Sequence, residues 1–205
     1  EIKLDDKKVE EILTSLPEET TSAPTVTFDL SSVKETETAS IPSNAAQTLA
    51  EAGVAVTVKL PEASVTLPPE TLAALANETS GAITVEASIV PMKELKGLQA
   101  AQVKGYETVI NVDVFAGGQK VDVPITISVP YKLKGNEKSK GVCLWYLGDE
   151  GNLTKIPATY DEATGMLTAV LTHQSSYLIG YDPVALWENV FSDVQAGAWY
   201  YGSVA

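Results

Sequence analysis

The stretch Glu107–Tyr131, ETVINVDVFAGGQKVDVPITISVPY, decides the fold class of this chain. Apolar and polar residues alternate on both sides of its centre, which is the period-two pattern of strands with one buried face. Gly117 and Gly118 stand at that centre, where a tight hairpin needs residues that accept positive φ angles. We therefore expect strands over 107–116 and 120–131, joined by a turn at the two glycines.

The same kind of pattern continues toward the C-terminus. Four further apolar segments follow at short spacing, and each is expected to form a strand: GVCLWYL (141–147), LTKIPATY (153–160), MLTAVLT (166–172) and SYLIGYD (176–182). The polar segments GDEGN (148–152) and DEATG (161–165) are rich in turn residues and separate them. Short strands at this spacing are typical of a sandwich or barrel rather than of a parallel α/β sheet.

Upstream of these strands lies a weak internal repeat. Residues 39–60 and 65–89 each give a short strand, a proline, an Ala/Leu-rich helix of about three turns, and a second strand. Pro69 fits the first position of a helix, and Gly53 fits a helix stop. Two copies are too few for a solenoid, which needs about three or more. The repeat therefore predicts a duplicated strand-helix-strand element inside one domain, after a first strand at 25–30.

The whole pattern predicts a mainly β protein, an irregular β-sandwich of about ten strands with a few short helices. The expected boundaries are 1–24 for a short amphipathic helix and linker, and 25–182 for the sandwich. The sandwich is expected as one unit or as two subdomains, 25–90 and 91–182. The remaining residues, 183–205, are expected to form a second linker and a truncated helical stub.

Composition excludes several classes of function. The chain has 205 residues and a net charge of −13, and all fourteen basic residues are lysines. Basic patches mark nucleic-acid binders, and arginine is the side chain that usually makes bidentate hydrogen bonds to phosphate and carboxylate groups. A nucleic-acid partner is thus excluded, and direct ion pairing with an anionic ligand is disfavoured. No apolar run approaches the roughly 20 residues of a transmembrane helix.

Chemistry-bearing motifs are scarce as well. One histidine, His173, and one cysteine, Cys143, cannot build the multi-ligand zinc sites known from proteins. No Gly-rich phosphate loop and no Gly-x-Ser-x-Gly motif is present. We therefore expect no cofactor, no metal and no catalytic residue, and we expect Cys143 to be buried as a small apolar side chain.

The last residues, Phe191–Ala205, read FSDVQAGAWYYGSVA and resemble the start of a bacterial S-layer homology repeat. That family begins with Phe-x-Asp-Val and continues, after a short gap, with a Trp-Tyr-Tyr group and a small-residue helix. An aspartate at this point can cap a helix, and the aromatic residues can pack a small bundle. The matching residues are Phe191, Asp193, Val194, Trp199, Tyr200, Tyr201, Val204 and Ala205.

The resemblance implies that the chain ends inside the first repeat, and that secondary cell-wall polysaccharide binds to repeats beyond Ala205. Residues 25–182, most clearly from Pro130 onward, also resemble a β-domain that often precedes such repeats in secreted Firmicutes proteins. The function expected is that of a non-catalytic surface module, secreted by a Gram-positive bacterium and held at its cell wall.

Two alternatives stay open. The first is a carbohydrate-binding or adhesin module that uses Tyr106, Tyr131 or Tyr160 against an unidentified glycan or protein ligand. The second is a self-cleaving domain similar to the ZU5 and GAIN families, cut between Gln174 and Ser175. There His173 would act as the base and Ser175 as the nucleophile, although Gln174 replaces the bulky apolar residue usual between them.

Overall fold

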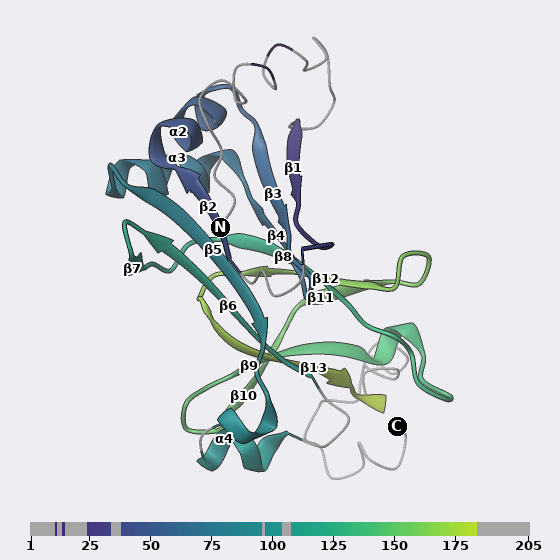
Figure 1. The fold of residues 1–205 in the computed structure, drawn as a ribbon. Coiled ribbons are helices and arrows are strands. Elements are labelled where there is room, and N and C mark those ends of the chain that lie inside the picture. The colour runs from purple at the N-terminus through teal and green to yellow at the C-terminus, as the bar shows by residue number, and fades with distance from the viewer. Residues whose placement is uncertain are drawn as a thin grey trace, which may run out of the picture.

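The computed structural model describes residues 24–33, 38–95, 97–103 and 108–183, together with residues 11 and 14. These residues are mainly β, and their strands form two sheets arranged as a sandwich (Figure 1). The predicted fold class is confirmed. Most of the predicted N-terminal helix and nearly all of the C-terminal stub lie outside the described residues.

The first sheet has six strands and is antiparallel except at one edge, where β1 and β3 run parallel. In spatial order its strands are β1 (Thr25–Asp29), β3 (Ala55–Lys59), β4 (Ser64–Leu67), β8 (Ile125–Pro130), β12 (Met166–Leu171) and β11 (Ala158–Asp161).

The second sheet has seven strands, of which β7 (Gln119–Lys120) pairs only with β6. The others, in spatial order, are β10 (Leu153–Ile156), β9 (Val142–Leu147), β13 (Ser175–Tyr181), β6 (Thr108–Ala116), β5 (Ala82–Ile89) and β2 (Thr38–Pro42). Strands from before and after residue 90 pair directly in both sheets, β4 with β8 and β5 with β6.

The internal repeat corresponds to two crossings between the sheets. Helix α2 (Ser43–Glu51) joins β2 to β3, and helix α3 (Pro69–Glu78) joins β4 to β5. Each helix therefore connects one sheet to the other, and the two helices pack together at the upper end of the sandwich (Figure 1). Pro69 is the first residue of α3, and Gly53 has a φ of 69° just past α2, as the sequence predicts.

The hairpin at the glycines is confirmed, but the strand after it is shorter than predicted. Gly117 and Gly118 have φ angles of 58° and 85° in the turn between β6 and β7. The chain then leaves this sheet over 121–124 and enters the other sheet as β8. Pro124 has no N–H to donate to a ladder, so a continuous strand through it is disfavoured.

The predicted strand at 153–160 is likewise two strands in two sheets. Strand β10 ends at Ile156, β11 begins at Ala158, and Pro157 lies between them. The same property of proline, a missing backbone donor, explains both breaks.

One large core lies between the sheets and under the two long helices. Alternate residues of β5 and β6 point into it, among them Val85 and Val112, and Leu49 and Leu75 enter it from α2 and α3. A smaller cluster lies on the outer face of the seven-stranded sheet: Leu95, Val103, Val109, Leu147 and Leu178. The short helix α4 (Gly97–Gln102) lies beside it, and the single turns η1 (Met92–Glu94) and η2 (Ser139–Gly141) complete the described elements.

The first and last strands of the sandwich lie toward opposite ends of the molecule. Strand β1 lies toward the top of Figure 1, whereas β13 ends near the bottom. The described chain thus begins at one end of the molecule and finishes toward the other.

Candidate functional site

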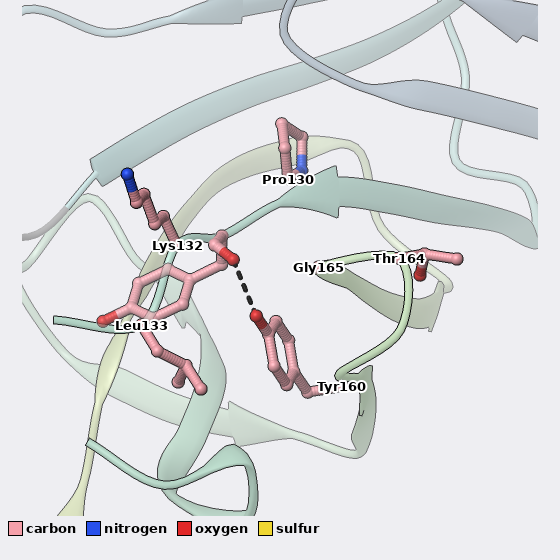
Figure 2. A pocket seen from close by; sticks show the side chains of 7 residues that line it. Pro130, Lys132, Leu133, Tyr160, Thr164 and Gly165 are labelled. Atoms are coloured by element: carbon pink, nitrogen blue, oxygen red, sulfur yellow. Dashed lines mark hydrogen bonds between the residues drawn. The ribbon is translucent and has the colours of Figure 1, made fainter. Parts of the chain in front are cut away.

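The structure brings together two of the three tyrosines that the sequence offered for ligand binding. Tyr131 follows β8, and its N–H donates to the Gly165 carbonyl at 2.9 Å, which extends the β8–β12 ladder by one bond. Tyr160 lies on β11, and its hydroxyl donates to the Tyr131 carbonyl at 2.9 Å (dashed in Figure 2). Tyr106 lies outside the described residues.

The two rings form an apolar corner. Their centroids are 6.3 Å apart and their planes meet at 88°, the edge-to-face arrangement that aromatic pairs prefer. Tyr131 is 8% exposed, whereas Tyr160 is only half-buried. Tyr160 therefore offers the accessible ring, and Tyr131 serves as its support.

An open groove of about 520 Å³ passes over this corner. Its lining residues are Pro130, Tyr131, Lys132, Leu133, Tyr160, Thr164 and Gly165. Lys132 and Thr164 lie on opposite sides of Tyr160 in Figure 2. The surface of the groove is mainly apolar, with Lys132 and Thr164 as polar groups at its margin.

The segment after Tyr131 is held by one carboxylate. The Tyr131 hydroxyl donates to Glu137 Oε2 at 3.0 Å, and the Lys134 N–H donates to the same oxygen at 2.8 Å. The Lys134 ammonium lies 5.8 Å from the centroid of the Tyr131 ring, within the range of a cation–π contact. Glu137 thereby holds the Tyr131 hydroxyl and the Lys134 backbone beside the groove.

The opposite margin of the groove is the turn between β11 and β12. The Asp161 carboxylate accepts from the Thr164 hydroxyl and from the Ala163 N–H, both at 2.8 Å. These two hydrogen bonds lower the pKa of Asp161, the Thr164 bond first. The carboxylate is thus turned into its own loop. Gly165 closes the turn with a φ of 69°, a conformation that favours glycine.

The candidate cleavage site lies at the start of β13. His173 is exposed, and its Nδ1 lies 4.0 Å from Asp122 Oδ2. Its carbonyl accepts a hydrogen bond from the buried Tyr177 hydroxyl. Ser175 is the first residue of β13 and pairs with Val112 of β6. Self-cleavage between Gln174 and Ser175 stays a hypothesis.

Gln174, the unusual residue of that site, has a structural role that sequence reasoning missed. Its side chain is 4% exposed. Its Oε1 accepts from the Val123 N–H at 2.9 Å, and its Nε2 donates to the Val123 carbonyl at 2.8 Å. The Gln174 N–H also donates to Asp122 Oδ1 at 2.8 Å. The amide of Gln174 thus replaces a strand partner for the segment that crosses between the sheets.

Of the other residues singled out in the sequence, the structure describes only Cys143. Cys143 is buried on β9, as predicted. Phe191, Asp193, Val194, Trp199, Tyr200 and Tyr201 all lie outside the described residues. In the part of the chain that the structure describes, no three His, Cys, Asp or Glu side chains are grouped to hold a metal ion. No helix there has both the length and the apolar character needed to cross a membrane.

A scan against protein-family models finds none that matches this chain, and a search of curated proteins finds no match either.

Proposed function

We propose that this chain is a non-catalytic surface module of a Gram-positive bacterium, secreted and held at the cell wall by S-layer homology repeats. The observation that carries the proposal is the motif from Phe191 to Tyr201, where Asp193 and Trp199 stand at the spacing of such a repeat. The partner would be secondary cell-wall polysaccharide, bound through repeats that continue beyond Ala205.

The arrangement of the sandwich is consistent with this role. Modules linked in series hold their neighbours apart when the chain enters at one end and leaves at the other. Strand β1 and the end of β13 are separated in this way (Figure 1). Residues 25–182 would then act as a spacer or display unit between the wall and whatever precedes them.

Sedimentation with purified cell-wall sacculi tests the proposal. The chain extended past Ala205 through complete repeats should sediment with sacculi that carry secondary polysaccharide, and should stay in solution once that polymer is removed. The 205-residue chain should stay in solution in both cases. Failure of the extended chain to sediment would refute wall anchoring, and sedimentation of the shorter chain would place the wall-binding site within these 205 residues.

A second candidate function is carbohydrate binding at the groove over Tyr131 and Tyr160. The specific observation in its favour is the half-buried Tyr160 ring, which is braced by Tyr131 and bordered by polar groups. The C–H groups on one face of a sugar ring carry partial positive charge and pack against the negative face of an aromatic ring. The sugar's hydroxyls then remain available to the polar margin of the groove.

A further inference from the structure

We infer that the groove over Tyr131 and Tyr160 selects acidic saccharides, those with a carboxylate or phosphate group, over neutral ones. This inference rests on the carbohydrate-binding candidate above and adds the charge of the ligand to it. The apolar corner would hold one face of the sugar, and the lysines beside it would hold the acidic group.

The local charge beside the groove is opposite to that of the whole protein. Residues 131–140, YKLKGNEKSK, contain Lys132, Lys134, Lys138 and Lys140, and Glu137 is their only acidic residue. All four lysines are exposed. In a chain with a net charge of −13, this segment is thus a basic island. Such an island attracts an anion locally even though the protein as a whole repels polyanions.

Contacts keep part of this island next to the groove. Lys132 lines the groove itself, and the Lys134 ammonium lies 5.8 Å from the centroid of the Tyr131 ring. Turn η2, which contains Lys140, packs beside β11, the strand that carries Tyr160. The Lys138 N–H donates to the Tyr181 hydroxyl at 3.2 Å, which fixes the backbone just before η2.

Acidic residues near the groove set where the ligand's charge can lie. The Glu137 carboxylate already accepts hydrogen bonds from the Tyr131 hydroxyl and the Lys134 N–H. Asp161 accepts two hydrogen bonds from its own turn, and Glu162 is exposed in that turn. The groove therefore has a basic side at 132–140 and an acidic side at 161–162. We expect the ligand's acidic group on the lysine side and its neutral hydroxyls near Thr164.

A saccharide fits this arrangement better than a nucleic acid or another extended polyanion. A long anionic chain would meet the repulsion of the net charge of −13 and of the 161–162 turn. A sugar with one carboxylate or phosphate can be held by ion pairs to only one or two exposed lysines. Each exposed ion pair is expected to change affinity by about two- to fivefold, because water and salt screen it.

The test compares saccharides that differ only in charge. The purified 205-residue chain is titrated with three matched pairs of monosaccharides: glucuronate and glucose, galacturonate and galactose, and mannose 6-phosphate and mannose. In at least one pair we expect the acidic member to bind about fivefold tighter or more, with the difference lost in 0.5 M salt as screening becomes strong. The carboxylate and phosphate pairs show which anion is preferred.

Variants then assign the site. Lys132→Gln should weaken the acidic ligand about two- to fivefold and leave its neutral partner unchanged. Lys93→Gln, an exposed lysine of η1, serves as the matched control and should change neither. Tyr160→Ala should abolish binding of both members, whereas Tyr160→Phe, which keeps the ring, should retain it. A thermal melt of each variant verifies folding, and Tyr160→Phe keeps the test valid if Tyr160→Ala unfolds.

The outcomes separate the inference from the function on which it rests. Equal affinity for the acidic and neutral members overturns the charge selection and leaves carbohydrate binding in place. Absence of binding to all six probes overturns both. Binding that survives in folded Tyr160→Ala moves the site elsewhere and refutes the groove.

Discussion

Replacing Gln174 with alanine should destabilise the sandwich more than any exposed substitution around it. The side chain is buried and makes two hydrogen bonds to the Val123 backbone, 51 residues away in the sequence. Val123 is itself 8% exposed, so water has little access to the N–H and the carbonyl that would lose their partner.

The magnitude follows from those two backbone groups. A hydrogen bond contributes about 1 kcal/mol net, but a buried donor or acceptor left without a partner costs about 1–3 kcal/mol. With two such groups and partial access of water, we expect Gln174→Ala to lower the free energy of unfolding by about 2–4 kcal/mol. Gln174→Leu should cost at least as much, because its bulk fills the space and keeps water from Val123.

Urea denaturation of the purified variants measures this, with far-UV and near-UV circular dichroism as two probes of the same transition. Thr172→Ala and His173→Ala, both at exposed positions next to Gln174, are the matched controls and should change stability by less than about 0.5 kcal/mol. A loss below about 1 kcal/mol for both Gln174 variants would refute the bridging role of the Gln174 amide. Full stability of Gln174→Leu alone would show that packing, not hydrogen bonding, is what the position requires.

Three further predictions concern other residues. Burial raises the pKa of Tyr177 to about 12 from a usual value of 10.0, so its contribution to stability is complete below pH 10 and is lost as pH rises toward 12. In urea denaturation from pH 8 to 12, the free energy of unfolding of the wild type should accordingly fall toward that of Tyr177→Phe. A difference between the two proteins that stays constant over this range would contradict this. Freshly purified chain should give one intact mass in denaturing mass spectrometry. Two fragments divided at Gln174–Ser175 and abolished by Ser175→Ala would instead establish self-cleavage. Gly141→Ala should cost about 1–3 kcal/mol, because its methyl group would overlap the Tyr181 ring. Gly97→Ala, which meets no atom within 4 Å, is its control, and equal effects would argue against the overlap.

Local pattern determined much of the fold. Alternation of apolar and polar residues predicted most strands, because a strand with one buried face requires that period wherever it occurs. Gly117 and Gly118 predicted the hairpin, and Pro69 and Gly53 predicted the limits of helices, because each of these residues restricts or frees its own backbone. The duplicated strand-helix-strand element was likewise readable, since both copies carry the same local features.

Local pattern did not determine which sheet each strand joins. The apolar runs on the two sides of Pro124 and of Pro157 each suggested a single strand, but the chain changes sheet at both prolines. Alternation is the same in either sheet, so it reports that a face is buried and not which sheet buries it. The choice depends on pairings between distant segments, such as β4 with β8.

The candidate site also arose partly from the sequence and partly from the fold. The sequence identified Tyr131 and Tyr160 as aromatic residues able to bind a ligand, but their meeting at 6.3 Å depends on the β8–β12–β11 pairing. The same holds for charge. The net charge of −13 argued against an anionic ligand, and only the contacts of residues 131–140 with the groove make their lysines a local exception. The burial of Gln174 could not be predicted from any sequence pattern. It depends on hydrogen bonds to the backbone of Val123, which lies 51 residues away in the sequence.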